Sequence, residues 1–273
     1  MKFEHIEVFN FENALRGMRN PLNSWNRIDS LFGVGSHDEF TDAVGTCISR
    51  WYPEEENLDQ ETIDHFWNNG VVRYTGPNDY IEWALIGHKD MKTATGLIHA
   101  GTEHRKFMRQ IMVTVDITAP LYWWKEFDTY KVGTTANSTS TMHKMLAKPI
   151  TLDCFEIGDF TNLPYPVEMQ REEIKSPCDT DFVQMCLIPY LEYLRQTAIS
   201  CGDAGDEETQ KIYWKELIRW LPESWLQTRT VTMNYENLRS MYHQRKNHKL
   251  VEWNTDFINF IKSLPYSDEF IIS

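Results

Sequence analysis

An alternating stretch that runs into an Ala-Pro pair constrains this chain more than any other feature. Between residues 107 and 117 the odd positions are mostly apolar, and this period of two predicts a strand with one face in a core. The two faces carry Phe107, Ile111, Val113, Val115 and Ile117 on one side, and Met108, Gln110, Met112, Thr114 and Asp116 on the other. Pro120 then suits the first turn of a helix, because its missing N–H has no partner there. A helix over 121–130 and a polar loop over 133–140 are therefore expected to meet the strand at one corner.

Apolar patterns predict the remaining elements. A strand is expected over 3–9, and helices are expected over 11–19, 37–51, 90–100, 180–200, 209–220, 231–245 and 251–264. Gly101 should close one helix in a left-handed conformation, and Pro189 should kink or break another. Residues 53–90 alternate short helical patterns with turns, and the prolines of 145–175 predict irregular structure. The sequence therefore predicts an α+β fold, with an antiparallel sheet flanked by helices and an α-rich C-terminal half.

The glycine pair of Gly33-Val34-Gly35-Ser36 invites a comparison with phosphate-binding turns. A dinucleotide fingerprint needs a preceding strand and a third glycine, and the sequence indicates neither. Ser36 or Asp38 can cap the helix that follows. An ordinary helix start is therefore the prediction, and a phosphate cradle is the weaker alternative.

Size and charge limit the possible partners. The chain has 273 residues and 41% hydrophobic content, enough to bury a substantial core. No Pro/Gly/Ser-rich linker divides it, so a single domain over 1–273 is expected. Its 27 Lys+Arg against 40 Asp+Glu give a net charge of −13, which argues against binding nucleic acid or an anionic membrane. An anionic small ligand would need a local basic pocket.

Signals for export, membrane insertion and metal binding do not emerge from the sequence. The N-terminal residues lack the apolar run of a signal peptide, and no run reaches the roughly 18 apolar residues that span a bilayer. The five cysteines are odd in number and form no C-x-x-C pair, and the nine histidines form no H-E-x-x-H motif. We therefore expect a soluble, cytoplasmic protein with buried thiols and no catalytic metal.

Two segments carry an order of residues that can be compared with a known family. Ala119-Pro120-Leu121 is followed by Glu126-Phe127-Asp128-Thr129-Tyr130-Lys131 and by Asn137-Ser138-Thr139-Ser140-Thr141-Met142-His143. This order resembles the flavin-dependent thymidylate synthases, in which A-P-[IL] and a helix lead to a signature close to Q-x-x-R-H-R-x-x-S-x-N-E-x-S-x-R-Y. With one residue inserted, Asn137 and Ser140 match the Asn and the second Ser of that signature. Upstream, His104 falls on the first His of the family motif H-E-T-P-F-E-H.

The second segment agrees with the family in its spacing. Leu221-Pro222 is followed by Thr232-Met233-Asn234, by Arg245 and by His248-Lys249-Leu250-Val251-Glu252. The family carries L-P, T-x-N, an Arg eleven residues later and H-A-Q-x-E, so the spacing agrees without a gap as far as Arg245. One deletion aligns the His and the Glu. The matched parts cover about residues 99–144 and 215–255, so the chain resembles a remote and divergent member.

The charged part of the signature departs from the family pattern. The R-H-R triplet is replaced by Thr129-Tyr130-Lys131, and the Gln before it by Glu126. Lys106 and Arg109 stand where the family has Thr and Glu, next to His104. We therefore expect positive charge to have moved across the pocket.

The resemblance implies a reaction, two ligands and an assembly. In the family, the reduced form of FAD supplies hydride, methylenetetrahydrofolate supplies the carbon placed on C5 of dUMP, and the sites lie between the subunits of a homotetramer. The chain would then be a methyltransferase of nucleotide biosynthesis that acts on dUMP or a related pyrimidine nucleotide. FAD contacts are implied at His104, Lys106, Arg109, Thr129, Tyr130, Lys131, Asn137 and Asn234. Substrate contacts are implied at Glu126, Ser140, Thr141 and Arg245, with Arg245 orienting the nucleotide and Ser140 holding its phosphate.

Structural alternatives stay open for these residues. Trp123 and Trp124 are more typical of a core than of a platform for a ligand ring. Arg245 can simply complement the dipole of a last helical turn, and Glu126 can be a solvated charge. Because function lives in the site, a catalytically inactive relative that binds a nucleotide or a protein partner is the alternative to an enzyme. An unrelated α+β protein with chance matches is a third, weaker possibility.

Overall fold

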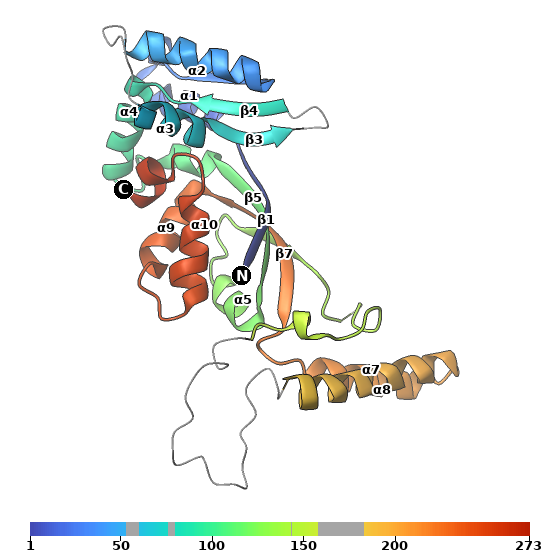
Figure 1. The fold of residues 1–273 in the computed structure, drawn as a ribbon. Helices are drawn as coiled ribbons and strands as arrows, with labels where there is room; N and C mark the ends of the chain where they lie inside the picture. The colour runs from blue at the N-terminus through green and yellow to red at the C-terminus, as the bar shows by residue number, and fades with distance from the viewer. Residues whose placement is uncertain (53–59, 76–79, 143, 158–182) are drawn as a thin grey trace, which may run out of the picture. The chain divides into compact units, whose positions relative to one another are not determined.

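The computed structural model describes residues 1–52, 60–75, 80–142, 144–157 and 183–273 (Figure 1). It divides into two compact units, of which unit 1 comprises Met1–Ile117, Tyr130–Asn137 and Thr230–Ser273, and unit 2 comprises Thr118–Thr129 and Ser138–Arg229. Strands β5 (Met112–Pro120) and β7 (Leu226–Asn234) carry the chain from one unit into the other. The single domain stays a prediction, and each unit is described by itself.

A four-stranded sheet holds the predicted alternating stretch. Its order is β1-β5-β7-β6, with β1 at Lys2–Phe9 and β6 at Thr135–Ser138. Three side-chain hydrogen bonds join β5 to β7: Thr114 with Thr232 at 3.1 Å, Asp116 with Thr230 at 2.5 Å, and Thr118 with Thr228 at 2.7 Å. The residue numbers rise along β5 while those of the partners fall along β7. β5 and β7 are therefore antiparallel. The residues between these positions on β5 are wholly buried, which confirms the predicted alternation from Ile111 to Ile117.

Three parts of this sheet differ from the prediction, and the first is β6, a strand within the stretch 133–140 that was expected to be a loop. Residues Lys106–Gln110 form a 3₁₀ helix (η3), and Met108 is wholly buried rather than on the polar face. Two consecutive buried residues, Phe107 and Met108, need a helical turn because a strand would point them to opposite faces. Residues 231–234 end β7 instead of starting a helix, and α9 (Tyr235–Arg245) begins only after Asn234.

A second, three-stranded antiparallel sheet lies in unit 1. Its order is β2-β4-β3, with β2 at Leu31–Gly35, β4 at Tyr80–Leu85 and β3 at Val71–Thr75. Helices α2 (His37–Trp51) and α3 (Gln60–Gly70) pack on it through a cluster that contains Phe40, Val44, Phe66, Trp83 and Leu85. The expectation of helical patterns and turns over 53–90 is therefore wrong for β3 and β4. The predicted turn 76–79 lies outside the described residues.

The segment Gly33–Ser36 shows why its glycines are there. A Cβ on Gly33 would lie 2.4 Å from the ring of Trp83, which packs across it. Ser36 accepts a hydrogen bond from Glu39 N at 3.3 Å, and Glu39 accepts one from Ser36 N at 2.7 Å, so the start of α2 carries a full capping box. The prediction that no strand precedes this segment is wrong, but the ordinary helix start is confirmed.

The remaining helices of unit 1 surround an aromatic core. They are α1 (Phe11–Met18), η1 (Asn20–Leu22), η2 (Trp25–Arg27), α4 (His88–His99), η7 (Glu252–Phe257), α10 (Ile258–Lys262) and η8 (Asp268–Ile272). Phe11 contacts Tyr235, Tyr266 and Phe270 with ring centroids 5.6, 5.9 and 6.3 Å away. Gly101 has φ +113°, as predicted for the residue that closes α4. The helices predicted over 11–19, 37–51 and 90–100 are confirmed to within about two residues.

Unit 2 is built around a pair of helices. It contains α5 (Leu121–Phe127), η4 (Leu152–Cys154), η6 (Val183–Leu187), α7 (Ile188–Asp203) and α8 (Glu207–Arg219), and α7 and α8 lie side by side (Figure 1). Pro189 stands in the first turn of α7, where the preceding π-helical turn ends. Residues 180–182 of the predicted helix and 158–175 of the predicted irregular segment lie outside the described residues. Antiparallel sheets and an α-rich C-terminal half confirm the α+β prediction.

The cysteines only partly follow the expectation of buried thiols. Cys47 is buried, and burial raises the pKa of its thiol to about 11. Cys154 and Cys201 are partly exposed and Cys186 is fully exposed, so the expectation is wrong for Cys186. Cys178 lies outside the described residues.

Candidate functional site

A tight loop of unit 1, over residues 130–134, leads into β6 and carries part of the predicted site. Thr134 Oγ1 donates to the carbonyl oxygen of Tyr130, and Asn237 Nδ2 donates to that of Val132 at 2.7 Å. Gly133 has φ +77°, and a Cβ there would lie 2.7 Å from Asn237 Oδ1. Glycine is required at this turn because both the backbone conformation and the space exclude a larger residue.

The predicted cofactor residue Asn234 caps the helix that supports this loop. Its side chain accepts from Asn237 N at 2.9 Å, and Asn237 Oδ1 accepts from Asn234 N at 3.3 Å. Asn234 is 8% exposed. The structure therefore gives Asn234 a capping role, and a contact with a cofactor stays a prediction.

Arg245 lies at the other end of the same helix and meets the loop again. Its Nε donates to Tyr130 Oη at 2.7 Å, and Tyr130 Oη donates to Gln244 Oε1 at 3.1 Å. The guanidinium carbon of Arg245 lies 4.5 Å from the ring centroid of Trp253, which is wholly buried, and 5.4 Å from that of Tyr130. Two aromatic faces and one hydroxyl thus fix the guanidinium, an arrangement that suits stacking and planar recognition.

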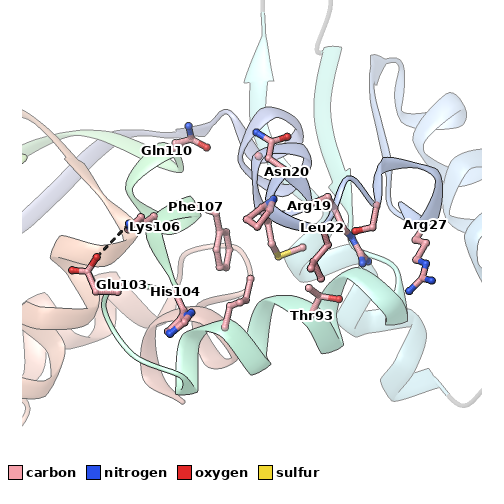
Figure 2. A pocket seen from close by; sticks show the side chains of 15 residues that line it. Arg19, Asn20, Leu22, Arg27, Thr93, Glu103, His104, Lys106, Phe107 and Gln110 are labelled. Carbon is pink, nitrogen blue, oxygen red and sulfur yellow. Dashed lines mark ion pairs between the residues drawn. The ribbon is translucent and has the colours of Figure 1, made fainter.

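A separate cavity of about 670 Å³ opens in unit 1 beside two other predicted residues (Figure 2). Its volume falls in the range of roughly 300–1,000 Å³ typical of small-molecule sites. His104 and Lys106 line it, and the apolar side chains include Met18, Leu97 and Phe107. The sequence predicted that His104 and Lys106 share a site, and the structure brings them to one cavity.

The inner wall of this cavity rests on a buried ion pair that the sequence did not reveal. Arg19 donates to Asp90 Oδ1 from Nε at 3.0 Å and from Nη2 at 2.7 Å. Asp90 Oδ2 accepts from Ser30 Oγ at 2.6 Å and from the N–H groups of Asp29 and Ser30, both at 3.1 Å. Asp29 in turn accepts from Lys89 N and Asp90 N at 2.9 and 3.0 Å, which caps α4. Because both carboxylates accept several hydrogen bonds and Arg19 is paired with Asp90, this cluster stabilises the cavity wall.

Six further polar residues line the cavity, and three of them, Asn20, Ser24 and Arg27, lie on the segment between α1 and β2. Arg27 is exposed, and Ser24 is 8% exposed. Asn20 Oδ1 accepts from Trp25 Nε1 at 2.8 Å, so its NH₂ group is not used in that contact. None of the three was predicted, and no local pattern identifies them, since the cavity joins segments 17–27 and 93–110.

The other predicted residues are spread over the surface of the two units. Arg109, Lys131 and Asn137 of unit 1 are exposed, and none is among the described residues that line the cavity. In unit 2, Thr129 Oγ1 donates to Glu126 O at 2.7 Å, and Ser140 Oγ accepts from Met142 N at 3.1 Å. These are local turn contacts. Binding by Thr129, Glu126, Ser140 and Thr141 stays a prediction.

The tryptophans of α5 have the structural role that was the favoured alternative. Trp123 and Trp124 are 0% and 1% exposed and pack against each other and Phe127. Trp124 Nε1 donates to Gln227 O at 2.9 Å, and the Arg229 guanidinium lies 4.2 Å from its ring centroid. A ligand ring has no access to either face, so neither tryptophan is a ring platform.

Metal ligands and membrane segments are not found within the described ranges. In the part of the chain that the structure describes, no three His, Cys, Asp or Glu side chains gather where they could hold a metal ion. Every helix in the described ranges is too short or too polar to cross a bilayer.

Comparisons with known proteins give one remote likeness. No protein-family model matches this chain, and no curated protein matches it. Two solved structures of the flavin-dependent thymidylate synthase ThyX from Helicobacter pylori, both with FAD and dUMP, are similar to it. The first is 15% identical, with 88% of this chain and 97% of that chain covered and a TM-score of 0.44. The second is 14% identical, with 89% and 96% covered and a TM-score of 0.44. With a TM-score of 0.44 and 14–15% sequence identity, the comparison supports only a remote similarity of fold. It gives no information on activity or on site residues.

Proposed function

We propose that this chain is a divergent flavin-dependent thymidylate synthase-like protein that binds FAD and a pyrimidine nucleotide. The observation that carries the proposal is the 2.7 Å hydrogen bond from Arg245 Nε to Tyr130 Oη. These residues are 115 positions apart, and each comes from one of the two segments that resemble the family. A chance match of spacing gives no reason for the two segments to meet at these positions.

The residues present fit a flavin nucleotide in part. Phosphates need cations and N–H donors, and an isoalloxazine ring needs flat apolar walls. The cavity of Figure 2 offers His104 and Lys106 beside Phe107, which is 4% exposed. The triplet Thr129-Tyr130-Lys131 keeps only one of the cations of R-H-R. We therefore assign cofactor binding to the cavity lined by His104 and Lys106. Tyr130 is assigned the role of positioning Arg245 through their hydrogen bond.

The proposed reaction is reductive methylation of dUMP or a related pyrimidine nucleotide, with methylenetetrahydrofolate as the carbon donor. Bound FAD, once reduced by an external reductant, would supply the hydride. Arg245 would orient the nucleotide, because its guanidinium is held in one plane by Trp253 and Tyr130. A cytoplasmic homotetramer belongs to the same proposal.

One observation favours a second candidate, an inactive relative that binds a nucleotide or a protein partner. At the central position of R-H-R, Tyr130 Oη both accepts from Arg245 and donates to Gln244. A hydroxyl used in this way stabilises the protein itself. The protein would then keep the fold without catalysing the thymidylate synthase reaction.

The visible absorption spectrum of the purified protein separates the two candidates. We expect a flavin band that stays with the protein after FAD is added and unbound FAD is removed by gel filtration, and a shift of that band when dUMP is titrated in. Release of tritium from C5-labelled dUMP in the presence of methylenetetrahydrofolate and a reductant would then establish the synthase. A flavin band without tritium release supports the inactive relative, and the absence of FAD binding at micromolar concentration contradicts the proposal.

A further inference from the structure

The cavity of Figure 2 has an excess of positive charge in a protein that is acidic overall. Its lining includes the basic residues Arg19, Arg27, His104 and Lys106, and one carboxylate, Glu103. The whole chain has a net charge of −13. Such a local excess concentrates anions, because the walls of a cavity focus the field of the charges that line it.

The basic residues are not equivalent. Arg19 is neutralised by Asp90, and Lys106 Nζ lies 3.3 Å from Glu103 Oε2. Arg27 forms neither an ion pair nor a side-chain hydrogen bond with any residue that the structure describes. Figure 2 shows Arg27 at one end of the cavity and His104 and Lys106 at the other. The uncompensated charge therefore lies at the Arg27 end.

Neutral hydrogen-bonding groups line the cavity together with this cation. The Asn20 side chain keeps its NH₂ group, since only its Oδ1 is used by Trp25. Ser24 is 8% exposed and lies between Asn20 and Arg27 in the chain. Apolar side chains, including Leu22, Leu97 and Phe107, complete the lining. A guanidinium, an amide NH₂ and a hydroxyl beside apolar walls suit a phosphate attached to a flat ring system.

We propose that this cavity binds the phosphate-bearing part of a nucleotide, with Arg27 as its main cation and Asn20 and Ser24 as neutral donors. This inference rests on the proposed function, because it takes FAD to be one of the nucleotides that bind in this cavity. It adds that the charge missing from Thr129-Tyr130-Lys131 is replaced by a residue of the segment between α1 and β2. Arg27, rather than Lys106 or Arg109, then decides the affinity for phosphate.

Equilibrium binding of ADP, FAD and riboflavin tests the inference without any assay of activity. Calorimetry measures ADP, and quenching of flavin fluorescence measures FAD and riboflavin, which carries no phosphate. Replacing Arg27 by Gln should weaken ADP and FAD by about tenfold, the usual effect of one charge-assisted hydrogen bond, and should leave riboflavin within about twofold. Arg27 is exposed, so the variant should fold.

Two further variants control the measurement. Arg16→Gln removes an exposed arginine of α1 that is not among the described residues lining the cavity, and it should bind all three ligands like the wild type. Glu103→Gln removes the carboxylate beside Lys106 and should strengthen ADP binding by about twofold, as expected for an exposed ion pair.

Each outcome decides between the two proposals. Equal ADP affinity in Arg27→Gln and the wild type, an equal loss in Arg16→Gln, or no binding of ADP and FAD to the wild type would overturn the inference. ADP binding that depends on Arg27, without FAD binding, keeps the inference and removes the proposed function. A flavin band that responds to dUMP but not to Arg27→Gln keeps the proposed function and removes the inference.

Discussion

Two arginines line the same cavity and have opposite surroundings. Arg19 is 6% exposed and shares its charge with Asp90, whose second oxygen accepts three further hydrogen bonds. Arg27 is exposed and has no acidic partner in the described part of the chain. The first arginine has its hydrogen bonds within the fold, and the second keeps its donors for a ligand. Both residues are arginines in the lining of one cavity, so neither residue type nor position distinguishes a structural arginine from one that binds a ligand. The hydrogen-bond and ion-pair partners of each side chain do distinguish them.

Breaking the buried pair should produce the largest effect on stability. Asp90→Ala leaves Arg19 buried without a counter-charge, so we expect a loss of about 3–5 kcal/mol in the free energy of unfolding. Urea denaturation followed by circular dichroism measures it. Asp42→Ala, at an exposed position of α2, is the matched control and should change stability by less than about 0.5 kcal/mol. Equal effects of the two variants would contradict a structural role for the Arg19–Asp90 pair.

Removing one neutral member of the same cluster should have a smaller effect. Ser30 Oγ donates to Asp90 Oδ2 at 2.6 Å and accepts from Gly87 N at 3.1 Å. Ser30→Ala should therefore cost about 1–3 kcal/mol, because it leaves two buried partners with one bond fewer. Thermal unfolding measures this loss. A change near zero would show that the other donors to Asp90 are sufficient.

A third arginine, Arg245, sharpens the comparison because it contacts two aromatic side chains, Tyr130 and Trp253. Tyr130→Phe removes the hydroxyl that accepts from Arg245 Nε but keeps the ring. We expect about a tenfold loss of dUMP affinity, and a loss of about 1 kcal/mol in stability, the typical value of one hydrogen bond. Calorimetric titration of dUMP gives the first quantity. If dUMP affinity is unchanged while stability falls, the contact is structural only.

A half-buried carboxylate, Asp116, provides the contrast in pH dependence. Hydrogen bonds from Thr230 and from His5 lower the pKa of Asp116. Since the folded-state pKa lies below the ordinary value, the stabilisation is complete above that value and is lost as the pH falls towards the lowered one. The stability difference between the wild type and Asp116→Asn should therefore shrink as the pH falls below about 4. Thermal unfolding between pH 3 and 7 measures it, and a difference that grows in acid would contradict this.

The smallest effect on stability is expected at Arg27. Arg27→Gln should change the free energy of unfolding by less than about 0.5 kcal/mol, since the side chain is exposed and forms no ion pair with a described residue. Urea denaturation tests this. A loss comparable to that of Asp90→Ala would mean that Arg27, like Arg19, is structural.

Local pattern predicted much of the fold. The alternation of 111–117 placed β5, and the cap and closing glycine placed α2 and α4, because these signals depend only on neighbouring residues. β7 was missed because a strand of period two runs directly into α9, so the apolar pattern has no gap where the structure changes. The strands β3 (VVRYT) and β4 (YIEWAL) were missed because consecutive apolar residues interrupt the alternation that marks a half-buried strand.

The candidate site was predictable only where a resemblance linked distant segments. It aligned Tyr130 and Arg245, which do meet, and it placed His104 and Lys106, which share a cavity. Arg19 and Asp90 are 71 residues apart, and nothing in either segment marks them as partners. Arg27 likewise becomes a candidate only when the fold places it at the cavity.

The proposed function requires that the protein bind both a flavin nucleotide and a pyrimidine nucleotide. The most direct measurement is the dissociation constant of FAD for the purified protein, determined by flavin fluorescence with and without dUMP. We predict saturable binding at micromolar FAD and a dissociation constant that changes when dUMP is present. Absence of saturation at micromolar FAD under both conditions would contradict the claim.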